Sequence, residues 1–350
     1  MSDRTIAFDH LTAEQKGEFK RLTSAPKLAW PSFCMWIALN AAFFSSYYLC
    51  GSGRMPLWVG MLLNSVVGYV AFSVVHDSLH RAISTNTKLN DGIGQLALVL
   101  VAPYVSLKLF RWGHVLHHRF ANGPLDPDRV LHGSWWTLPF RWVFIDGFYL
   151  IYAITKGDKV SRPFLIQSYW FAALFLCFIG VLTALGYGLD VLMLWFIPTR
   201  VIFLTLGFSF FWLPHVPHDV EQEHNFTRAT TIREGAEWFM GPALQNQNYH
   251  LIHHLYPMTP FYNNHKVWHL LEPEELRRGT APRSKSPWTS WRAGGPPLNP
   301  PGFYGTYLKK TAYFALISAI GTDSRPRCQR GIDLACPERS VRTERIIRCV

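Results

Sequence analysis

The sequence predicts an all-α integral membrane protein, with four transmembrane helices in two hairpins and a cytoplasmic helical cap rich in histidine. Three observations lead to this fold class. Apolar residues make up 49% of the chain and charged residues only 16%, whereas soluble proteins carry about 25% charged residues. The apolar residues form long blocks, as membrane-spanning helices require. Histidines recur at spacings of three and four, which place side chains on one face of a helix.

Four apolar blocks are long enough to cross a bilayer core of about 30 Å, which takes about 20 residues of helix. They cover about residues 28–50, 56–75, 165–187 and 190–213. Residues 51–56 join the first two blocks, and residues 186–190 join the last two. Because both connections are short, each pair of spans is expected to form a tight helical hairpin.

The distribution of basic residues predicts how these spans are oriented in the membrane. The two short turns carry one basic residue, Arg54, and every other Lys or Arg outside the spans lies in residues 1–27, 76–164 or after 213. Because cytoplasmic loops concentrate Lys and Arg, these three regions and both termini are expected on the cytoplasmic side. The formal charge of +11 has the same explanation, so no nucleic-acid partner is expected. Residues 1–27 are polar and mixed in charge, which predicts no cleavable signal peptide.

Two apolar segments of the long connection are not expected to cross the membrane. Residues 93–107 are too short for a full span and predict a re-entrant or interfacial hairpin. Residues 135–154 are rich in Trp, Phe and Tyr and predict an amphipathic helix in the interface, with the aromatic residues as an interfacial belt. The six cysteines include no CxxC pair, which argues against a disulfide framework or a zinc ribbon.

Eight of the fifteen histidines fall into three groups with helical spacing, all on the cytoplasmic side of the predicted topology. These groups are His76 and His80 in HDSLH, His114, His117 and His118 in HVLHH, and His250, His253 and His254 in HLIHH. His215 and His218 come where the fourth span ends and can reach the same point. Since a buried imidazole brings a donor and an acceptor that both need partners, packing does not readily explain this clustering. The pattern predicts a metal site.

The number and type of ligands restrict the metal. Structural zinc takes four protein ligands and catalytic zinc takes three, so eight or nine histidines suit two metal ions better than one zinc site. The sequence has no HExxH motif, which argues against a zinc metalloprotease. Calcium and magnesium prefer oxygen ligands. Imidazole suits iron, copper, zinc and nickel, so ligand chemistry alone leaves these metals open.

The three boxes HDSLH, HVLHH and HLIHH, placed between paired spans, resemble those of the membrane fatty acid desaturase and hydroxylase superfamily over about residues 28–275. The resemblance implies two iron ions (Fe²⁺) and an oxidoreductase that uses O2 and two electrons to desaturate or hydroxylate a lipid. The flanks QNYHLIHHLYP, LPH and HVLHHRFANGPLDPD are similar to the carotenoid ring hydroxylases, a monooxygenase branch, and more distantly to carotenoid ketolases.

The resemblance also implies roles for particular residues. Besides the eight box histidines, it makes His215 the ninth ligand, and His218 is a weaker candidate. The expected ligands are His76, His80, His114, His117, His118, His215, His250, His253 and His254, and no catalytic residue is expected beyond them. Asp77, Asp126 and Asp128 stand beside box histidines and are candidates to accept a ring N–H, or, for the latter two, to form a polar turn. The expected divisions are residues 1–27 (cytoplasmic segment), 28–275 (catalytic domain), 276–320 (Pro/Gly-rich with a short amphipathic stretch) and 321–350 (disordered tail).

The expected partners are a lipid substrate, the membrane and an electron donor. The sequence shows no CxxCH haem motif and no GxGxxG loop, so a separate ferredoxin or cytochrome is expected as the donor. Lys108, Arg111, Arg119 and Arg129 could attract an acidic donor, although the bias of cytoplasmic loops explains them equally well. A fatty acyl desaturase is the first alternative to carotenoid hydroxylation. A membrane metal transporter is a more remote alternative. Transport sites use ionisable residues within the spans, and Arg200 is the only charged residue in the interior of the four predicted spans.

Overall fold

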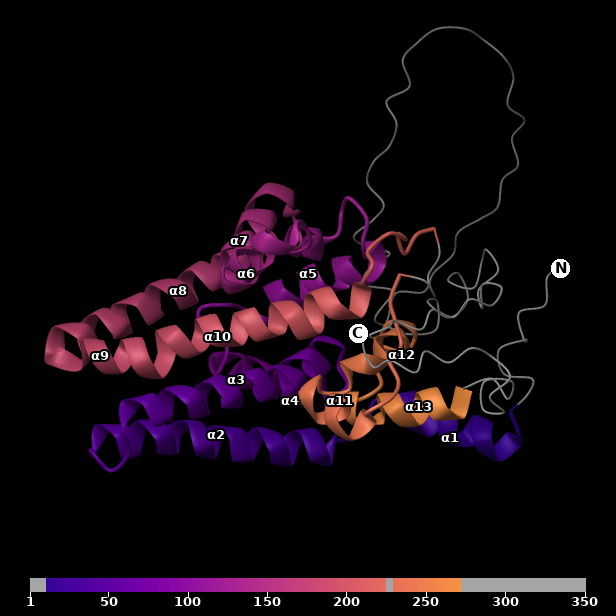
Figure 1. The fold of residues 1–350 in the computed structure, drawn as a ribbon, viewed down its shortest axis with the longest axis horizontal. Coiled ribbons are helices and arrows are strands. Elements are labelled where there is room, and N and C mark those ends of the chain that lie inside the picture. The colour runs from indigo at the N-terminus through magenta and orange to yellow at the C-terminus, as the bar shows by residue number, and fades with distance from the viewer. Residues whose placement is uncertain (1–10, 225–228, 272–350) are drawn as a thin grey trace, which may run out of the picture. The chain divides into compact units, whose positions relative to one another are not determined.

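The computed structural model describes residues 11–224 and 229–271, and all regular elements in these ranges are helices (Figure 1). Their bounds are α1 Ala13–Thr23, α2 Trp30–Gly51, α3 Leu57–Leu79, α4 Thr87–Val99, α5 Leu107–Phe120, α6 Leu138–Val143, α7 Ile145–Lys156, α8 Arg162–Leu182, α9 Gly188–Val191, α10 Ile197–Leu206, α11 Glu237–Ala243, α12 His250–Leu255 and α13 Asn264–Leu271. The predicted Pro/Gly-rich segment 276–320 and disordered tail 321–350 lie outside the described residues.

Helices α2 and α3 form the first predicted hairpin and lie side by side in Figure 1. Helix α2 begins one residue before Pro31, which suits the first turn because its missing N–H would have no partner there. Helix α3 continues to Leu79, one turn beyond the expected end at residue 75. His76 therefore lies within the last turn of α3 and does not follow the span.

The second hairpin is helical almost throughout. Three helical stretches of the described residues are long and apolar enough to cross a membrane, namely Trp30–Gly51, Leu57–Leu79 and Arg162–His215. The third stretch has 54 residues, and the chain reverses direction within it, between α8 and α10 (Figure 1). The reversal lies at Gly186, whose φ of 96° is accessible to glycine because it has no Cβ.

Polar side chains connect the two hairpins inside the apolar layer. The Asn64 amide of α3 donates to the Leu194 carbonyl oxygen at 2.8 Å and accepts a hydrogen bond from the Ser46 hydroxyl of α2 at 2.6 Å. The Tyr47 hydroxyl donates to the same carbonyl at 3.1 Å. Without water to compete, such interhelical bonds help to fix how apolar helices pair.

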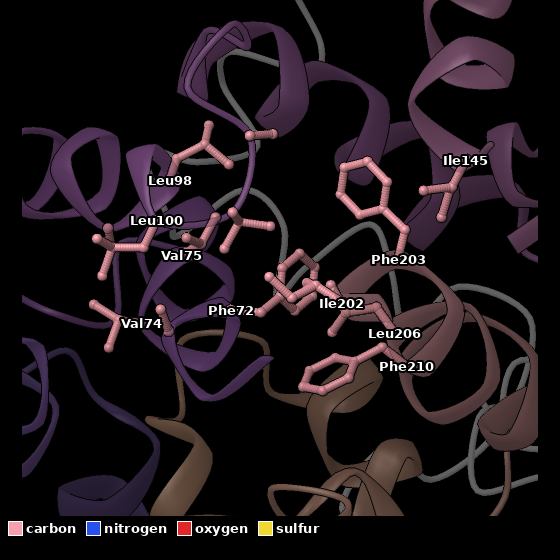
Figure 2. Close-up of a cluster of buried hydrophobic side chains, with 14 of the residues drawn as sticks. Phe72, Val74, Val75, Leu98, Leu100, Ile145, Ile202, Phe203, Leu206 and Phe210 are labelled. Atoms are coloured by element: carbon pink, nitrogen blue, oxygen red, sulfur yellow. The ribbon is translucent and has the colours of Figure 1, made fainter. Parts of the chain in front are cut away.

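The main apolar core lies between α3 and α10. Figure 2 shows Phe72 and Val75 of α3 close to Ile202, Leu206 and Phe210 of the second hairpin, all of them buried. The outward faces are also apolar. Trp170 and Leu174 of α8 are 68% and 67% exposed, which suits contact with lipid because the helical backbone is already hydrogen-bonded.

The connection between the hairpins folds into short helices. The apolar stretch 93–107 forms the end of α4 and the turn into α5, and it is not among the helical stretches long and apolar enough to cross a membrane. Residues 135–154 form a single turn followed by α6 and α7, with Trp135 82% exposed. Arg200 of α10 anchors α7, because its guanidinium donates to Asp146 at 2.8 and 3.1 Å.

The remaining helices gather at the end of the hairpins opposite their turns (Figure 1). Helix α1 packs against α13, and Phe19 and Leu22 share a buried cluster with Val267 and Trp268. Helix α12 contacts α13 directly. The third histidine box is therefore held from outside by two helices that carry none of the box histidines.

Candidate metal centre

The nine predicted histidines come together at one place in the fold. They lie on the last turn of α3 and just after it, on α5, on the turn that follows α10, and on α12. Eight are at most 5% exposed, and His118 is partly buried. The ring nitrogens of eight of them form two groups, which we call the first cluster (His76, His80, His114 and His253) and the second cluster (His117, His215, His250 and His254).

The Nε2 atoms converge within each cluster. In the first cluster, His114 Nε2 lies 2.8 Å from His80 Nε2. His118 Nε2 joins this cluster, at 3.1 Å from His114 Nε2 and 2.9 Å from His253 Nε2. In the second cluster, His250 Nε2 lies 3.1 Å from the Nε2 atoms of both His215 and His254. Two nitrogens bound at right angles to one ion at about 2.0–2.1 Å lie about 3 Å apart, so the spacing suits shared coordination.

The histidines of each HxxHH box are divided between the two clusters, and helix geometry explains the division. The first and last histidines of HxxHH are four residues apart and lie on the same face of the helix. The middle histidine directly precedes the last one and is rotated from it by about 100° around the helix axis. On α5, His114 and His118 face the first cluster and His117 faces the second. On α12 the division is reversed, since His250 and His254 face the second cluster and His253 the first. The second and third boxes thus contribute to both clusters, and the first box contributes only to the first cluster.

The Nδ1 atoms of the second cluster are all held by acceptor oxygens. His215 Nδ1 lies 3.1 Å from the Ala229 carbonyl, and His250 Nδ1 lies 2.6 Å from Gln247 Oε1. His254 Nδ1 lies 3.0 Å from Gln222 Oε1. A carbonyl oxygen can only accept, so it requires N–H at Nδ1 and leaves Nε2 as a bare lone pair.

His117 has the strongest such support, from two carboxylates. Its Nδ1 lies 2.9 Å from Asp126 Oδ1 and 3.1 Å from Asp128 Oδ2. Asp126 also accepts the backbone N–H groups of Asn122 and Asp128, and the Tyr149 hydroxyl donates to Asp128. The predicted contact of these two carboxylates with a box histidine is therefore present, and the polar turn is present as well.

The electrostatics of the site follow from burial. Burial, together with repulsion from neighbouring rings, lowers the pKa of His114, His118, His253 and His254 well below the ordinary value, so these rings are neutral. Neutral imidazole is the form that binds a metal. His117 differs, because burial is outweighed by attraction to Asp128 and Asp126, and the pKa of His117 is raised. The carboxylates hold one proton at Nδ1 whether the ring is neutral or charged, so a metal ion at Nε2 would take the place of the second proton.

This donor set fits metal ions. In the second cluster, the Nε2 lone pairs of His215, His250 and His254 face one another at 3.1 Å, and the acceptors behind the rings keep the protons on Nδ1. Facing lone pairs repel, and a cation between them removes the repulsion. All-imidazole coordination suits iron, copper, zinc or nickel.

Three of the candidate neighbouring residues have contacts other than the expected ones. Among the described residues, the Asp77 carboxylate forms no hydrogen bond with a histidine. It accepts from the Ser32 hydroxyl at 3.2 Å and from the Phe261 backbone N–H at 3.0 Å. Asp77 follows His76 in the sequence, but the helical rotation turns it toward α2 and the segment before α13. Its observed contacts therefore connect elements and do not orient a ring.

His218 lies outside both clusters. Its ring packs against that of His132, with centroids 3.8 Å apart, and its Nδ1 lies 3.3 Å from Asn122 Oδ1. Burial lowers the pKa of His218 to about 4. The three-residue separation from His215 does not bring it to the same point, because helical backbone ends at His215 and the chain turns away.

All three guanidinium nitrogens of Arg111 form hydrogen bonds within the protein. Its guanidinium donates to Asp91 at 2.6 and 3.0 Å and to the carbonyl oxygens of Ser78 and Leu79 at 2.9 and 3.0 Å. These carbonyls lie at the C-terminal end of α3, next to His80. The other three basic candidates, Lys108, Arg119 and Arg129, are exposed.

Two glutamines of the site were not predicted. Gln222 and Gln247 are 4% and 2% exposed and hold His254 and His250. Gln247 lies three residues before His250, a helical spacing that could have indicated the contact. Gln222 reaches His254 from a turn 32 residues away, and no local pattern reveals that contact.

The sequence is similar to those of known desaturases and of a ketolase. The profile of the fatty acid desaturase family matches residues 52–286. The chain is 31% identical over 227 residues to a dihydrorhizobitoxine desaturase of Bradyrhizobium elkanii, covering 56% of this chain and 62% of that protein. It is 41% identical over 108 residues to an omega-3 fatty acid desaturase of Caenorhabditis elegans, covering 30% of this chain and 25% of that protein.

A third relative is a beta-carotene ketolase of a Paracoccus species, 28% identical over 207 residues, which cover 55% of this chain and 70% of that protein. The chain thus spans less than two thirds of the length of the two desaturases. The family match includes all three histidine boxes and more than half of the chain. With an all-helical fold in the described residues and two converging histidine clusters, the chain belongs to the fatty acid desaturase family.

Proposed function

We propose that this protein is a membrane-bound, O2-dependent, non-haem di-iron oxidoreductase that oxidises an unactivated C–H bond of a lipid. The convergence of nine histidines into two clusters, with Nε2 atoms about 3 Å apart, carries this proposal. The first cluster with His118 would hold one iron ion and the second cluster the other. When bound, the two irons supply the activation of O2 and the oxidation of the C–H bond, which side chains alone cannot perform.

The protein's own residues prepare this chemistry. Neutral imidazoles are positioned by hydrogen bonds at Nδ1, so little rearrangement is needed at the metal positions. Phe72 and Phe210 pack against His76, with ring centroids 6.2 and 5.7 Å away, and Phe110 packs against His114 at 6.4 Å. These rings form an apolar wall where α3 and the second hairpin meet the first cluster. The wall excludes water and suits a hydrocarbon that arrives from the membrane layer.

We also propose the topology of four crossings predicted above, with the metal centre and both termini on the cytoplasmic side. The two hairpins and their turns at one end of the described fold support this topology, as does the distribution of basic residues (Figure 1). Electrons would come from a separate donor, such as a ferredoxin or a cytochrome, that docks on the cytoplasmic side.

Two substrates are supported by separate observations. Hydroxylation of a carotenoid ring is the first candidate, supported by the LPH and QNYHLIHH flanks and by the likeness to a beta-carotene ketolase. Desaturation of a fatty acyl chain is the second candidate, supported by the likeness to two proteins named desaturases. Both reactions start from removal of hydrogen at an unactivated carbon, so one site is compatible with either.

Expression in a carotene-producing bacterium separates these candidates. Pigments and fatty acid methyl esters are extracted from the same cells and compared with those of cells that express the His250→Ala variant. A new polar carotenoid supports hydroxylation, and a new unsaturated acyl chain supports desaturation. If purified protein binds zinc but no iron, and iron restores no O2 uptake with either lipid, the proposed function is wrong.

A further inference from the structure

One ring of the first cluster lacks the support that every ring of the second cluster has. Every histidine of the second cluster has its Nδ1 within 3.1 Å of an acceptor oxygen. In the first cluster, among contacts within the described residues, the Nδ1 atom of His114 is buried and has no hydrogen-bond partner. A hydrogen bond at Nδ1 selects the tautomer and fixes the ring orientation, so all four rings of the second cluster are prepared to bind a metal, whereas His114 of the first cluster is not held in this way.

We propose that the second cluster is the high-affinity half of the centre, loaded first and emptied last, and that Gln222 and Gln247 are the positioning residues responsible for this order. The inference rests on the proposed di-iron function. It adds that the two metal positions are unequal, and it names side chains outside the ligand set that make them so.

Gln222 has a second contact that bears on this role. Its Nε2 donates to the backbone carbonyl oxygen of His118, and its Oε1 faces His254 Nδ1 at 3.0 Å. The carbonyl can only accept, so it orients the amide and leaves Oε1 for His254. The side chain thus connects the second box, on α5, with the third box, on α12. The rings of His118 and His254 also stack, with centroids 4.1 Å apart and planes at 21°.

Gln247 provides a simpler contact. Its Oε1 lies 2.6 Å from His250 Nδ1. Its Nε2 is buried and, among contacts within the described residues, has no hydrogen-bond partner. Replacement by glutamate would keep the acceptor, remove the unsatisfied donor and convert the contact into a carboxylate–histidine pair like that of Asp126 with His117. A carboxylate raises the basicity of the metal-binding nitrogen.

The test is an anaerobic Fe²⁺ titration of the full-length protein in detergent, after the metal has been removed with a chelator. Bound iron is measured by elemental analysis against a competing chelator, and ⁵⁷Fe Mössbauer spectra are recorded at one and two equivalents. In the wild type, we expect one tight and one weaker equivalent, with a single quadrupole doublet at one equivalent. His215→Ala should remove the tight equivalent, and His76→Ala should leave it.

Glutamine variants test the positioning role. Gln222→Met and Gln247→Met should weaken the tight equivalent by about 10- to 100-fold, the usual effect of losing a partner behind a ligating histidine. The Gln247→Glu variant should retain the affinity of the tight equivalent, because the carboxylate still accepts from His250 Nδ1. Gln245→Met is the matched control. Gln245 is 5% exposed, accepts a hydrogen bond from the Ser73 hydroxyl, donates one to the Tyr69 carbonyl and, among the described residues, has no hydrogen bond with a histidine. Its effect measures the general cost of removing a buried glutamine.

The outcomes separate the inference from the proposed function. Two equivalents of equal affinity in the wild type would overturn the inference and leave the di-iron function intact. The same holds if Gln222→Met and Gln247→Met match Gln245→Met, or if Gln247→Glu weakens binding as much as Gln247→Met does. Absence of iron binding in the wild type would overturn the proposed function itself.

Discussion

At the scale of single residues, Arg111 shows how a basic side chain beside a histidine box can have a structural role. Its guanidinium fork connects Asp91 of α4 with the Ser78 and Leu79 carbonyls, which end α3. The Arg111 and Asp91 side chains are only 11% and 26% exposed. The last turn of α3 carries His76, so the contacts of Arg111 help to hold this histidine of the first cluster in place.

Arg111→Lys is expected to lower the thermal stability of the protein. An ammonium group cannot reproduce the planar fork, and the loss of hydrogen bonds to the two carbonyls costs about 1–3 kcal/mol. Thermal unfolding of the purified protein, followed by circular dichroism, measures the change. Arg119→Lys is the control, since Arg119 is exposed on the same helix. Equal melting temperatures for the two variants would contradict the structural role.

At the scale of elements, the approach of α3 to its neighbours depends on a small residue. A Cβ at Gly68 would lie 2.9 Å from the Leu100 carbonyl oxygen and would overlap the Ile202 side chain. Small residues allow membrane helices to approach this closely. The same helix presents Phe72 and Val75 to the core in Figure 2, so its position also determines where His76 and His80 lie.

Gly68→Ala is expected to destabilise the protein by about 1–3 kcal/mol, because a backbone carbonyl cannot move away cheaply. Gly180→Ala is the matched control. A Cβ at Gly180 of α8 meets nothing within 4 Å, so this change should be neutral or stabilising by up to about 1 kcal/mol through helix propensity. Melting temperatures of both variants in the same detergent provide the comparison, and a Gly68→Ala protein as stable as the wild type would refute close packing at this site.

At the scale of the whole molecule, three exposed basic residues remain as candidates for donor docking. Lys108 and Arg119 lie on α5, the helix that supplies the second box, and Arg129 lies in the turn Pro127–Leu131, which contacts α5. Opposite charges across an interface act mainly on the association rate and are screened by salt. A donor that docks here would be close to both clusters, because α5 contributes to each of them.

Reversal of these three charges to glutamate is expected to lower the turnover rate at limiting donor by about tenfold or more and to abolish its dependence on ionic strength. The rate supported by a small chemical reductant should stay unchanged. Lys16, Lys20 and Lys88, which are also exposed, provide the control reversal at other sites. Equal losses for both sets of reversals would exclude a specific docking surface.

Much of this fold could be predicted from the sequence. The spans expected at 28–50 and 56–75 correspond to Trp30–Gly51 and Leu57–Leu79, because apolar length alone determines which segments can cross a membrane. The nine histidines expected at the metal site also lie together, because helical spacing and the end of each span restrict where their rings can point. The role of these histidines as ligands stays a prediction that the iron titration tests.

Only the tertiary structure decided how the histidines divide and what holds them. Spacing indicated that each box occupies one helix face, but α5 and α12 lie so that the second and third boxes each contribute to both clusters, whereas the first box contributes to the first cluster alone. His253 meets His118 across 135 residues, and Gln222 meets His254 across 32. The physical reason is that side-chain identity and local periodicity determine which residues can bind a metal. Which rings share an ion depends on how separate helices pack, and no local pattern in the sequence records that packing.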